Sequence, residues 1–347
     1  MAMADVTVMG AGIFGLSVAF ACARRGATVR VLDRRGVAAG SSGGVVGALA
    51  PHVPENWNSK KAFQLESLLM AEAFWKEADA LSGVQSGYAR LGRLQPIPDE
   101  AAVGLALARE ETARELWGDA ADWTVVDAVD AGDWRPESAT GLYIWDTLTA
   151  RAHPRRCCES LAGAVQALGG AVEVGDAPGD GPVVWATGYE GLIALSEELG
   201  RDVGNGVKGQ AVSLRFDAHD KAQLFVDGLH IVPHADGTVA VGSTSEREFD
   251  APDAVDAAAD ALVERAVAAC PVLYGAKVMQ RCAGVRPRAR SRAPMLGGWP
   301  GRDGHFIANG GFKIGFGMAP KVGAVIADLV LEGHDAVPEG FRVEDNL

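Results

Sequence analysis

The sequence has 347 residues, of which 48% are hydrophobic and 22% charged, and its formal net charge at pH 7 is −13. A chain of this length can bury a large core and form about two domains. The strong negative charge argues against a nucleic-acid-binding surface, and no apolar run approaches the roughly 20 residues of a membrane-spanning helix.

The cysteines and the N-terminus bear on the cellular compartment. The five cysteines include no C-x-x-C pair and no zinc-ligand spacing, which is typical of reduced thiols in a cytoplasmic protein. We therefore expect no structural metal and no disulfide framework. The first residues, MAMADVTVMGAG, enter an apolar strand at once, so we expect no signal peptide.

The first predicted elements are a strand, a helix and a second strand over residues 6–33, VTVMGAGIFGLSVAFACARRGATVRVLD. Gly10, Gly12 and Gly15 form a G-x-G-x-x-G motif between the first strand and the helix, which we expect to end with Gly26 as its C′ residue. In this motif the first glycine permits a tight turn, the second lets backbone approach a pyrophosphate, and the third lets the helix pack on the strand.

An acidic residue follows at the expected distance. Asp33 ends the second strand, 18 residues after Gly15, about where a carboxylate accepts the ribose hydroxyls of a dinucleotide. The helix N-terminus adds N–H groups and a partial positive charge for phosphate. The pattern predicts dinucleotide binding. Arg34 and Arg35 suit either a 2′-phosphate or a solvated turn, so the motif alone leaves FAD and NAD(P) open.

The middle of the chain continues with a loop, a helix and strands. The loop GSSGGVVGALAPHVP, residues 40–54, is small and polar and then apolar, which suits a backbone that passes under a planar ring. Residues 60–81 predict a long amphipathic helix with Phe74 and Trp75 in the core. The later segments VSLRF, LHIVPH and TVAVGST have the length and β-branched content of strands in an antiparallel sheet.

The last predicted elements are a glycine-rich loop and a helix. Residues 309–323, NGGFKIGFGMAPKVG, contain five glycines and precede the apolar run AVIADLVLEG. We expect the helix to begin near residues 318–320. Glycine beside a helix N-terminus allows backbone to approach a flat or anionic group closely.

With these motifs in this order, the sequence resembles the glycine oxidase/D-amino acid oxidase-like (DAO) family of FAD-dependent flavoproteins. The family's loop of the form [ST][ST]xAxxGxL is matched by Ser41, Ser42, Gly47 and Leu49. Further segments that resemble the family are YARLGRLQPI, RAHPRRCCESLAGAVQALGGAVEV, VVWATGYEGL, CAGVRPRARSRAPMLGG and GGFKIGFGMAP. The motif order agrees over nearly the whole chain.

The resemblance implies an α/β fold, α+β overall, with a Rossmann-like FAD-binding domain and a discontinuous antiparallel-sheet substrate domain. The FAD-binding domain would comprise residues 1–82, 148–207 and 282–347. The substrate domain would comprise residues 83–147 and 208–281, and its sheet would cover the flavin face.

The resemblance also implies FAD as the cofactor. Residues 311–317 would wrap the isoalloxazine, and the following helix N-terminus would stabilise the negative charge that reduction places at the flavin N1–C2=O edge. Cys282 lies near the position where sarcosine-oxidase-like relatives attach flavin covalently, but the surrounding tail differs, so we expect a buried free thiol and non-covalent FAD. The residues implied at the cofactor are Gly10, Gly12, Ile13, Phe14, Gly15, Asp33, Arg34, Ser41, Ser42, Gly47, Leu49, Val174, Ala186, Thr187, Gly188, Gly311, Phe312, Lys313, Ile314, Gly315, Phe316 and Gly317.

Four residues are implied at the substrate. Arg286 matches the family's carboxylate-binding arginine, whose guanidinium fork fits both oxygens; a structural salt bridge is the alternative. Lys313 occupies a second basic position where arginine is usual, and His230 stands where glycine oxidases carry a tyrosine. His52 follows the flavin loop and would line the pocket. Gly311 replaces the family's histidine, so the substrate side departs from the family pattern.

Arg288, Arg290 and Arg292 add positive charge just past Arg286. We expect them to form surface ion pairs in this acidic protein. Attraction of an anionic substrate is the alternative.

The function implied is oxidation of the C–N bond of an amino acid or amine, with glycine or another small amino acid first. Hydride would pass to flavin N5, water would hydrolyse the imine, and oxygen or another acceptor would reoxidise the flavin. The alternatives are a 2-hydroxy acid dehydrogenase of the same fold, a flavin domain acting on modified tRNA, and a nicotinamide enzyme. We expect a small-molecule substrate and a cytoplasmic protein with no nucleic-acid or membrane partner. The sequence does not indicate an oligomeric state.

Overall fold

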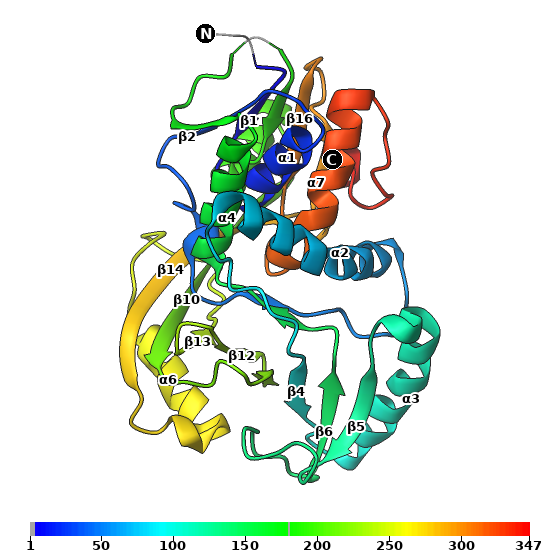
Figure 1. The fold of residues 1–347 in the computed structure, drawn as a ribbon, viewed down its shortest axis with the longest axis vertical. Coiled ribbons are helices and arrows are strands. Elements are labelled where there is room, and N and C mark those ends of the chain that lie inside the picture. The colour runs from blue at the N-terminus through cyan, green and yellow to red at the C-terminus, as the bar shows by residue number, and fades with distance from the viewer. Residues whose placement is uncertain (1–3, 180) are drawn as a thin grey trace.

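The computed structural model describes residues 4–179 and 181–347, which form two stacked bodies (Figure 1). The upper body in that view holds elements from both ends of the sequence, among them β1 (Val6–Met9) and α7 (Gly315–Glu332). The lower body is built from the middle of the chain. Segments that are far apart in sequence therefore meet in the upper body.

The upper body is organised on a six-stranded sheet with the order β15-β16-β9-β1-β2-β8. The five strands from β16 to β8 run parallel to one another, and β15 pairs antiparallel with β16 at one edge. Every residue of β1 is buried, as its short apolar run predicts for a strand covered on both faces. The other strands are β2 (Val29–Asp33), β8 (Ala171–Val174), β9 (Val183–Trp185), β15 (Met295–Gly298) and β16 (His305–Asn309).

Helices complete the upper body. α1 packs against α4 and α7, and α2 packs across α4 and α7. Trp75 and Phe74 of α2 are buried at 1% and 5% exposure, which confirms their predicted place in the core. The helices are α1 (Ile13–Ala23), α2 (Ser59–Ser82), α4 (Pro154–Ala167), α5 (Gly188–Leu199) and α7.

Two predicted helix boundaries are wrong. α1 ends at Ala23, and Gly26 lies in a following turn that is closed by the hydrogen bond from Gly26 N to Ala23 O. α7 begins at Gly315 rather than near residues 318–320, and it continues through Pro320. The glycines and the proline lower helix propensity, but burial of the first turns of α7 against the core outweighs that cost.

The lower body is organised on an eight-stranded sheet with the order β14-β10-β13-β12-β11-β4-β6-β5. Its neighbours are antiparallel except for the parallel pair β4 and β11. α6 (Ala257–Ala269) packs on β10 and β13, and α3 (Glu100–Trp117) packs on β5. The strands are β4 (Arg93–Pro96), β5 (Trp123–Asp127), β6 (Leu142–Asp146), β10 (Gly204–Arg215), β11 (Gln223–Val226), β12 (Leu229–Pro233), β13 (Thr238–Gly242) and β14 (Lys277–Ala289).

The expected fold class, a Rossmann-like sheet with a separate antiparallel sheet, is confirmed. The expected domain bounds stay a prediction, because residues 207 and 282 lie inside β10 and β14, the long paired strands that run from one body toward the other. A minor two-stranded sheet joins β3 (Ala48–Leu49) to β7 (Ala150–Arg151). Among the helices of the described residues, none has both the length and the hydropathy to cross a bilayer.

Candidate functional site

A cavity of about 550 Å³ opens between the two bodies. Its walls come from the turn after β1, the loop that contains Ser41 and Ser42, the turn between β9 and α5, the strands β10 and β14, and residues 308–316. Both glycine-rich ends of the sequence thus reach one cavity, with the antiparallel sheet on the opposite side.

One end of the cavity is built at the start of α1. Gly12, Ile13 and Phe14 line it. The N-cap residue of α1 is Gly12, which has no side chain to cap the helix. In the described chain the first turn of α1 also has no acidic residue. Ser42 Oγ accepts a hydrogen bond of 3.0 Å from Ile13 N, which ties the loop to the helix start. A helix N-terminus with no acidic residue in its first turn favours an anionic ligand.

The other two glycines of the motif serve packing. A Cβ on Gly10, whose φ is +111°, would lie 2.3 Å from Ala186 O, and a Cβ on Gly15 would lie 1.9 Å from Gly10 O. Any side chain at either position would therefore separate β1, α1 and β9. Gly12 faces the cavity, while Gly10 and Gly15 hold the elements together.

Asp33 stands at the same end of the cavity. Its Oδ2 accepts from Ala11 N at 2.9 Å, and its Oδ1 accepts from Arg35 N at 2.8 Å and Gly36 N at 3.2 Å. The carboxylate therefore braces the glycine turn beside the cavity. Arg34 points away, 62% exposed, and pairs with Glu190.

The residues predicted at the cofactor fall into two groups, and their roles stay predictions in both. Those that line the cavity are Gly12, Ile13, Phe14, Asp33, Ser41, Ser42, Ala186, Thr187, Gly188, Gly311, Phe312, Lys313, Gly315 and Phe316. Those outside the lining are Gly10, Gly15, Arg34, Gly47, Leu49, Val174, Ile314 and Gly317. Gly47 packs against the residue that follows β7, where a Cβ would lie 1.6 Å from Ala152 O, and Val174 is 74% exposed.

The start of α7 forms a second helix N-terminus at the cavity. The N-cap residue Ile314 gives no side-chain cap, and the first turn of α7 in the described chain has no acidic residue. Phe312, just before it, has a φ of +43°. Arg288 and Lys313 place their cationic groups 5.9 and 5.7 Å from the centre of its ring. The expected ion pairs of Arg288, Arg290 and Arg292 are absent from the described residues.

Arg286 of β14 projects its guanidinium into the cavity wall. Its Nη2 donates to Ser243 Oγ at 2.5 Å and its Nη1 donates to Thr244 O at 3.3 Å. The guanidinium lies over Gly209, where a Cβ would come within 1.9 Å of Nη2. Burial lowers the pKa of Arg286, and the Glu246 carboxylate opposes that effect. Within the described residues no carboxylate lies within 4.0 Å of it.

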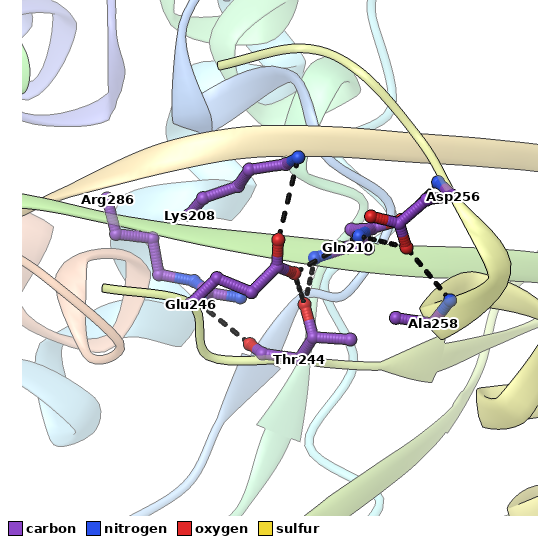
Figure 2. Close-up of polar contacts among 7 residues, drawn as sticks. All are labelled: Lys208, Gln210, Thr244, Glu246, Asp256, Ala258 and Arg286. Atoms are coloured by element: carbon purple, nitrogen blue, oxygen red, sulfur yellow. Dashed lines mark hydrogen bonds and ion pairs between the residues drawn. The ribbon is translucent and has the colours of Figure 1, made fainter. Parts of the chain in front are cut away.

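A polar network behind Arg286 fixes the segment that holds it (Figure 2). Thr244 Oγ1 accepts a hydrogen bond of 2.7 Å from Gln210 N, and Glu246 Oε1 accepts one of 3.1 Å from Gln210 Nε2. Glu246 also forms an ion pair with Lys208 at 3.5 Å. Gln210 Nε2 also donates to Asp256 Oδ1 at 2.9 Å at the start of α6. Sequence reasoning missed this network, although the polar run STSE after β13 is its signal.

His230 of β12 also lines the cavity. Its ring contacts Phe225, with ring centres 4.6 Å apart, and its Nδ1 lies 3.2 Å from Gln223 Nε2. Burial, and then the charges of Arg93, Lys313 and Arg286, lower the pKa of His230 to about 3. The imidazole is therefore neutral near neutral pH. Arg286, Lys313 and His230 line the same cavity.

The structure does not bring His52 to that cavity, so its expected pocket position is wrong. The backbone N of His52 donates to Gln64 Oε1 at 2.7 Å, and its Nδ1 lies 2.5 Å from the same oxygen. This pair of contacts turns the ring toward α2. Burial lowers the pKa of His52.

Cavity residues that sequence reasoning did not single out include Ser243, Phe225 and Tyr189. Cys282 is a free thiol that also lines the cavity, and burial raises its pKa. Within the described residues, no three His, Cys, Asp or Glu side chains are grouped so that they could hold a metal ion.

Comparison with known proteins gives consistent matches. The family model described as DAO, FAD dependent oxidoreductase, matches residues 5–329. A glycine oxidase from Pseudomonas putida is 28% identical and aligns over 99% of each chain. A bifunctional protein ThiO/ThiG from a Nostoc species is 25% identical over 94% of this chain, which spans about half, 53%, of that relative's length. The structure of a Bacillus cereus glycine oxidase superposes with a TM-score of 0.83 at 20% identity over 96% of each chain.

Proposed function

This chain belongs to the DAO family of FAD dependent oxidoreductases, and from that premise we propose that it oxidises the C–N bond of a small amino acid or amine. The product would be an imine that water hydrolyses. The observation that carries the proposal is the partly buried Arg286 guanidinium, which faces the cavity with no carboxylate partner in the described residues. The glycine oxidases among the relatives support the same reaction class.

The cavity fits FAD. It is lined both by residues from the start of α1 and by residues of β12 and β14. The helix N-termini of α1 and α7 suit an anionic pyrophosphate and the electron-rich edge of a flavin. Asp33 suits a ribose, and the missing side chain at Gly311 makes way for the ring of Phe14, which a Cβ there would approach to 2.9 Å. FAD, when bound, supplies the two-electron acceptor for the substrate hydride.

The protein residues would bind and orient the substrate. Arg286 would hold the substrate carboxylate with its planar fork, and its own position would be set by Ser243 and Thr244. A neutral His230 would offer a hydrogen bond rather than a charge. The buried wall would exclude water from the reacting C–N bond, which strengthens the electrostatic contact to the carboxylate.

Two further points belong to this proposal. We place the protein in the cytoplasm, which its five free cysteines support. We also infer that FAD is held non-covalently. If the flavin stayed with acid-precipitated protein, attachment through Cys282 would replace this inference.

The proposed reaction is tested by anaerobic mixing of the FAD-loaded protein with a panel of amino acids, amines and 2-hydroxy acids. Loss of the oxidised-flavin absorbance with an amine or amino acid is the expected result. Arg286→Ala should lose reduction by carboxylated amines while it keeps flavin binding. Arg288→Ala, on the ring of Phe312, is the matched control and should keep reduction. Reduction by a 2-hydroxy acid and by no amine would overturn the C–N assignment.

A further inference from the structure

Two cations at the substrate end of the cavity lack an acidic partner. Three cationic side chains line the cavity: Arg35, Arg286 and Lys313. Arg35 is at the dinucleotide end and pairs with Glu190 at 3.3 Å. Within the described residues, neither Arg286 nor Lys313 has a carboxylate within 4.0 Å.

The cations behind the cavity wall differ in this respect. Lys208, at 4% exposure, pairs with Glu246 at 3.5 Å, and Arg93, at 6% exposure, pairs with Asp146 at 2.8 Å. Of the three buried lysines and arginines outside the cavity lining, these two are neutralised by a carboxylate, whereas Arg151, at 7% exposure, donates to Pro233 O instead. Arg286 and Lys313, which line the cavity, keep charges that a bound anion can neutralise.

The spacing of these two charges is fixed by the backbone. Phe312 N donates to Pro287 O at 2.9 Å, so the residue before Lys313 is tied to the residue after Arg286. Phe312 takes a left-handed φ of +43° at this turn, and its ring lies below the Lys313 ammonium group. Arg286 and Lys313 therefore come from separate segments, and a backbone hydrogen bond between the residues next to them holds the two segments together.

Arg286 is partly buried and Lys313 is exposed. Like charges that line one cavity repel each other, and a bound dianion offsets that repulsion. Burial and the neighbouring Arg286 charge both lower the pKa of Lys313, which is the response expected of two facing cations. One carboxylate fits the guanidinium fork, and a second fits a point charge such as an ammonium group.

We propose that the site takes an amino acid or amine with two carboxylates, one held by Arg286 and the other by Lys313. The second carboxylate is carried on the side chain or on the amine nitrogen. This inference rests on the proposed function for the reaction, but the binding of two carboxylates can be tested without it.

The kinetic test compares substrates that differ by one carboxylate. Iminodiacetate is compared with N-methylglycine, and each enantiomer of aspartate with the same enantiomer of alanine, by the second-order rate of anaerobic flavin reduction. The expected result is a preference for the diacid in at least one pair. Lys313→Met should lower the diacid rate constant by about 10- to 100-fold, the effect of one charge-assisted hydrogen bond, and change the monoacid value by less than about threefold.

Two variants separate the role of Lys313 from general charge effects. Lys313→Arg should keep the diacid preference, because it keeps the cation. Lys321→Met removes a lysine on α7 that pairs with Glu66 outside the cavity, and should leave the preference unchanged. Equal losses for monoacid and diacid in Lys313→Met would mean that Lys313 serves the flavin alone, and would overturn the proposal.

The binding test needs no turnover. Succinate and malonate are titrated against acetate into the FAD-loaded protein by calorimetry, and the flavin spectrum is followed in parallel. Tighter binding of a dicarboxylate that Lys313→Met abolishes supports the inference even if no amine reduces the flavin, in which case only the proposed reaction fails. Equal binding of acetate and both dicarboxylates overturns the inference whatever the reaction.

Discussion

Arg286 owes its position to the absence of a side chain on the neighbouring strand. Its guanidinium lies over Gly209 of β10, opposite Gly284 of β14 in the register of the two strands. Gly209 has ordinary extended backbone, so glycine is needed here because it has no side chain, not because of its conformational freedom. The far end of an arginine can move, and a new methyl group would therefore displace it without breaking the strand.

We predict that Gly209→Ala impairs substrate binding while the protein stays folded. The added Cβ would stand 1.9 to 2.3 Å from three guanidinium atoms, so Arg286 must leave Ser243 and Thr244. The rate of flavin reduction by carboxylated substrates should fall about 10- to 100-fold, as expected for lost hydrogen bonds to a charged group. Stopped-flow reduction at several substrate concentrations measures it.

The control is Gly298→Ala, at the end of β15, where an added Cβ has nothing within 4 Å. It should leave the reduction rate unchanged. Wild-type reduction by Gly209→Ala would show that the guanidinium pose described above is not used in binding.

His234 is a second residue for which the structure predicts a measurable effect, on the pH dependence of stability. It is 2% exposed, its Nε2 lies 2.9 Å from Val45 O, and its ring lies 5.1 Å from that of His153. Burial lowers its pKa to about 4. The unfolded chain takes up a proton below about pH 6.5 and the native state does not, so stability falls as the pH falls through that value.

We predict that replacing His234 flattens this pH dependence. Between pH 7.5 and 5.5 the wild-type protein should lose about 1 kcal/mol of unfolding free energy through this residue, and His234→Gln should not lose that part. Urea unfolding at the two pH values measures the difference. The exposed His219, 59% accessible, gives the control His219→Gln with a wild-type slope. A wild-type slope in His234→Gln would contradict the prediction.

At the scale of elements, the close contact of α1 with α7 depends on a glycine in the middle of a helix. A Cβ on Gly323 of α7 would lie 2.6 Å from Ser17 O in α1. Glycine costs about 1 kcal/mol in a helix interior relative to alanine. Here the absence of a side chain lets the two helices that begin at the cavity pack closely, which offsets that cost.

Gly323→Ala should therefore lower the free energy of unfolding, although replacing glycine by alanine in a helix usually raises it. The clash is with backbone, which cannot rotate away, and overpacking of this kind costs about 1–3 kcal/mol. Gly104→Ala in α3, where a Cβ would meet nothing within 4 Å, should stabilise by about 0.5–1 kcal/mol. Chemical unfolding of both variants measures the difference. Stabilisation by both would contradict the close packing of α1 and α7.

The local elements were predictable where a short motif carries its own geometry. The strand, glycine turn, helix and acid over residues 6–33 lie within one supersecondary unit, and each appears in the structure. The start of α7 was not predictable from propensity, because the glycines and Pro320 weaken the helix locally while burial in the core restores it. His52 was misplaced because its partner Gln64 lies on the next helix, and a loop sequence does not reveal such a partner.

At the scale of the whole molecule, the cavity is shared by the two bodies. Residues of the upper body contribute the two helix N-termini, and β10, β12 and β14 contribute the opposite wall. The network behind Arg286 joins Gln210 to residues 34 and 46 positions away. Sequence patterns do not specify contacts at such separations. For the same reason the substrate side was less predictable than the dinucleotide end.

We predict that FAD stabilises the protein as a whole, because a ligand that binds only the folded state shifts the unfolding equilibrium. At a free FAD concentration of 100 times Kd the gain is about 2.7 kcal/mol. Thermal unfolding of flavin-free protein, with and without added FAD, measures it. Riboflavin lacks the phosphates that the N-terminus of α1 would bind, and should give a smaller shift. Equal Tm values with and without saturating FAD would contradict a cofactor that joins the two bodies.

The walls of the cavity are synthesised far apart in time. The ribosome releases the turn after β1 well before the segment around Phe312. A nascent polypeptide can therefore form the first phosphate-binding turn long before it can enclose a flavin. Complete cofactor loading must await the arrival of β16 and α7, so a prematurely terminated product that lacks them would keep the glycine motif and still fail to retain its coenzyme.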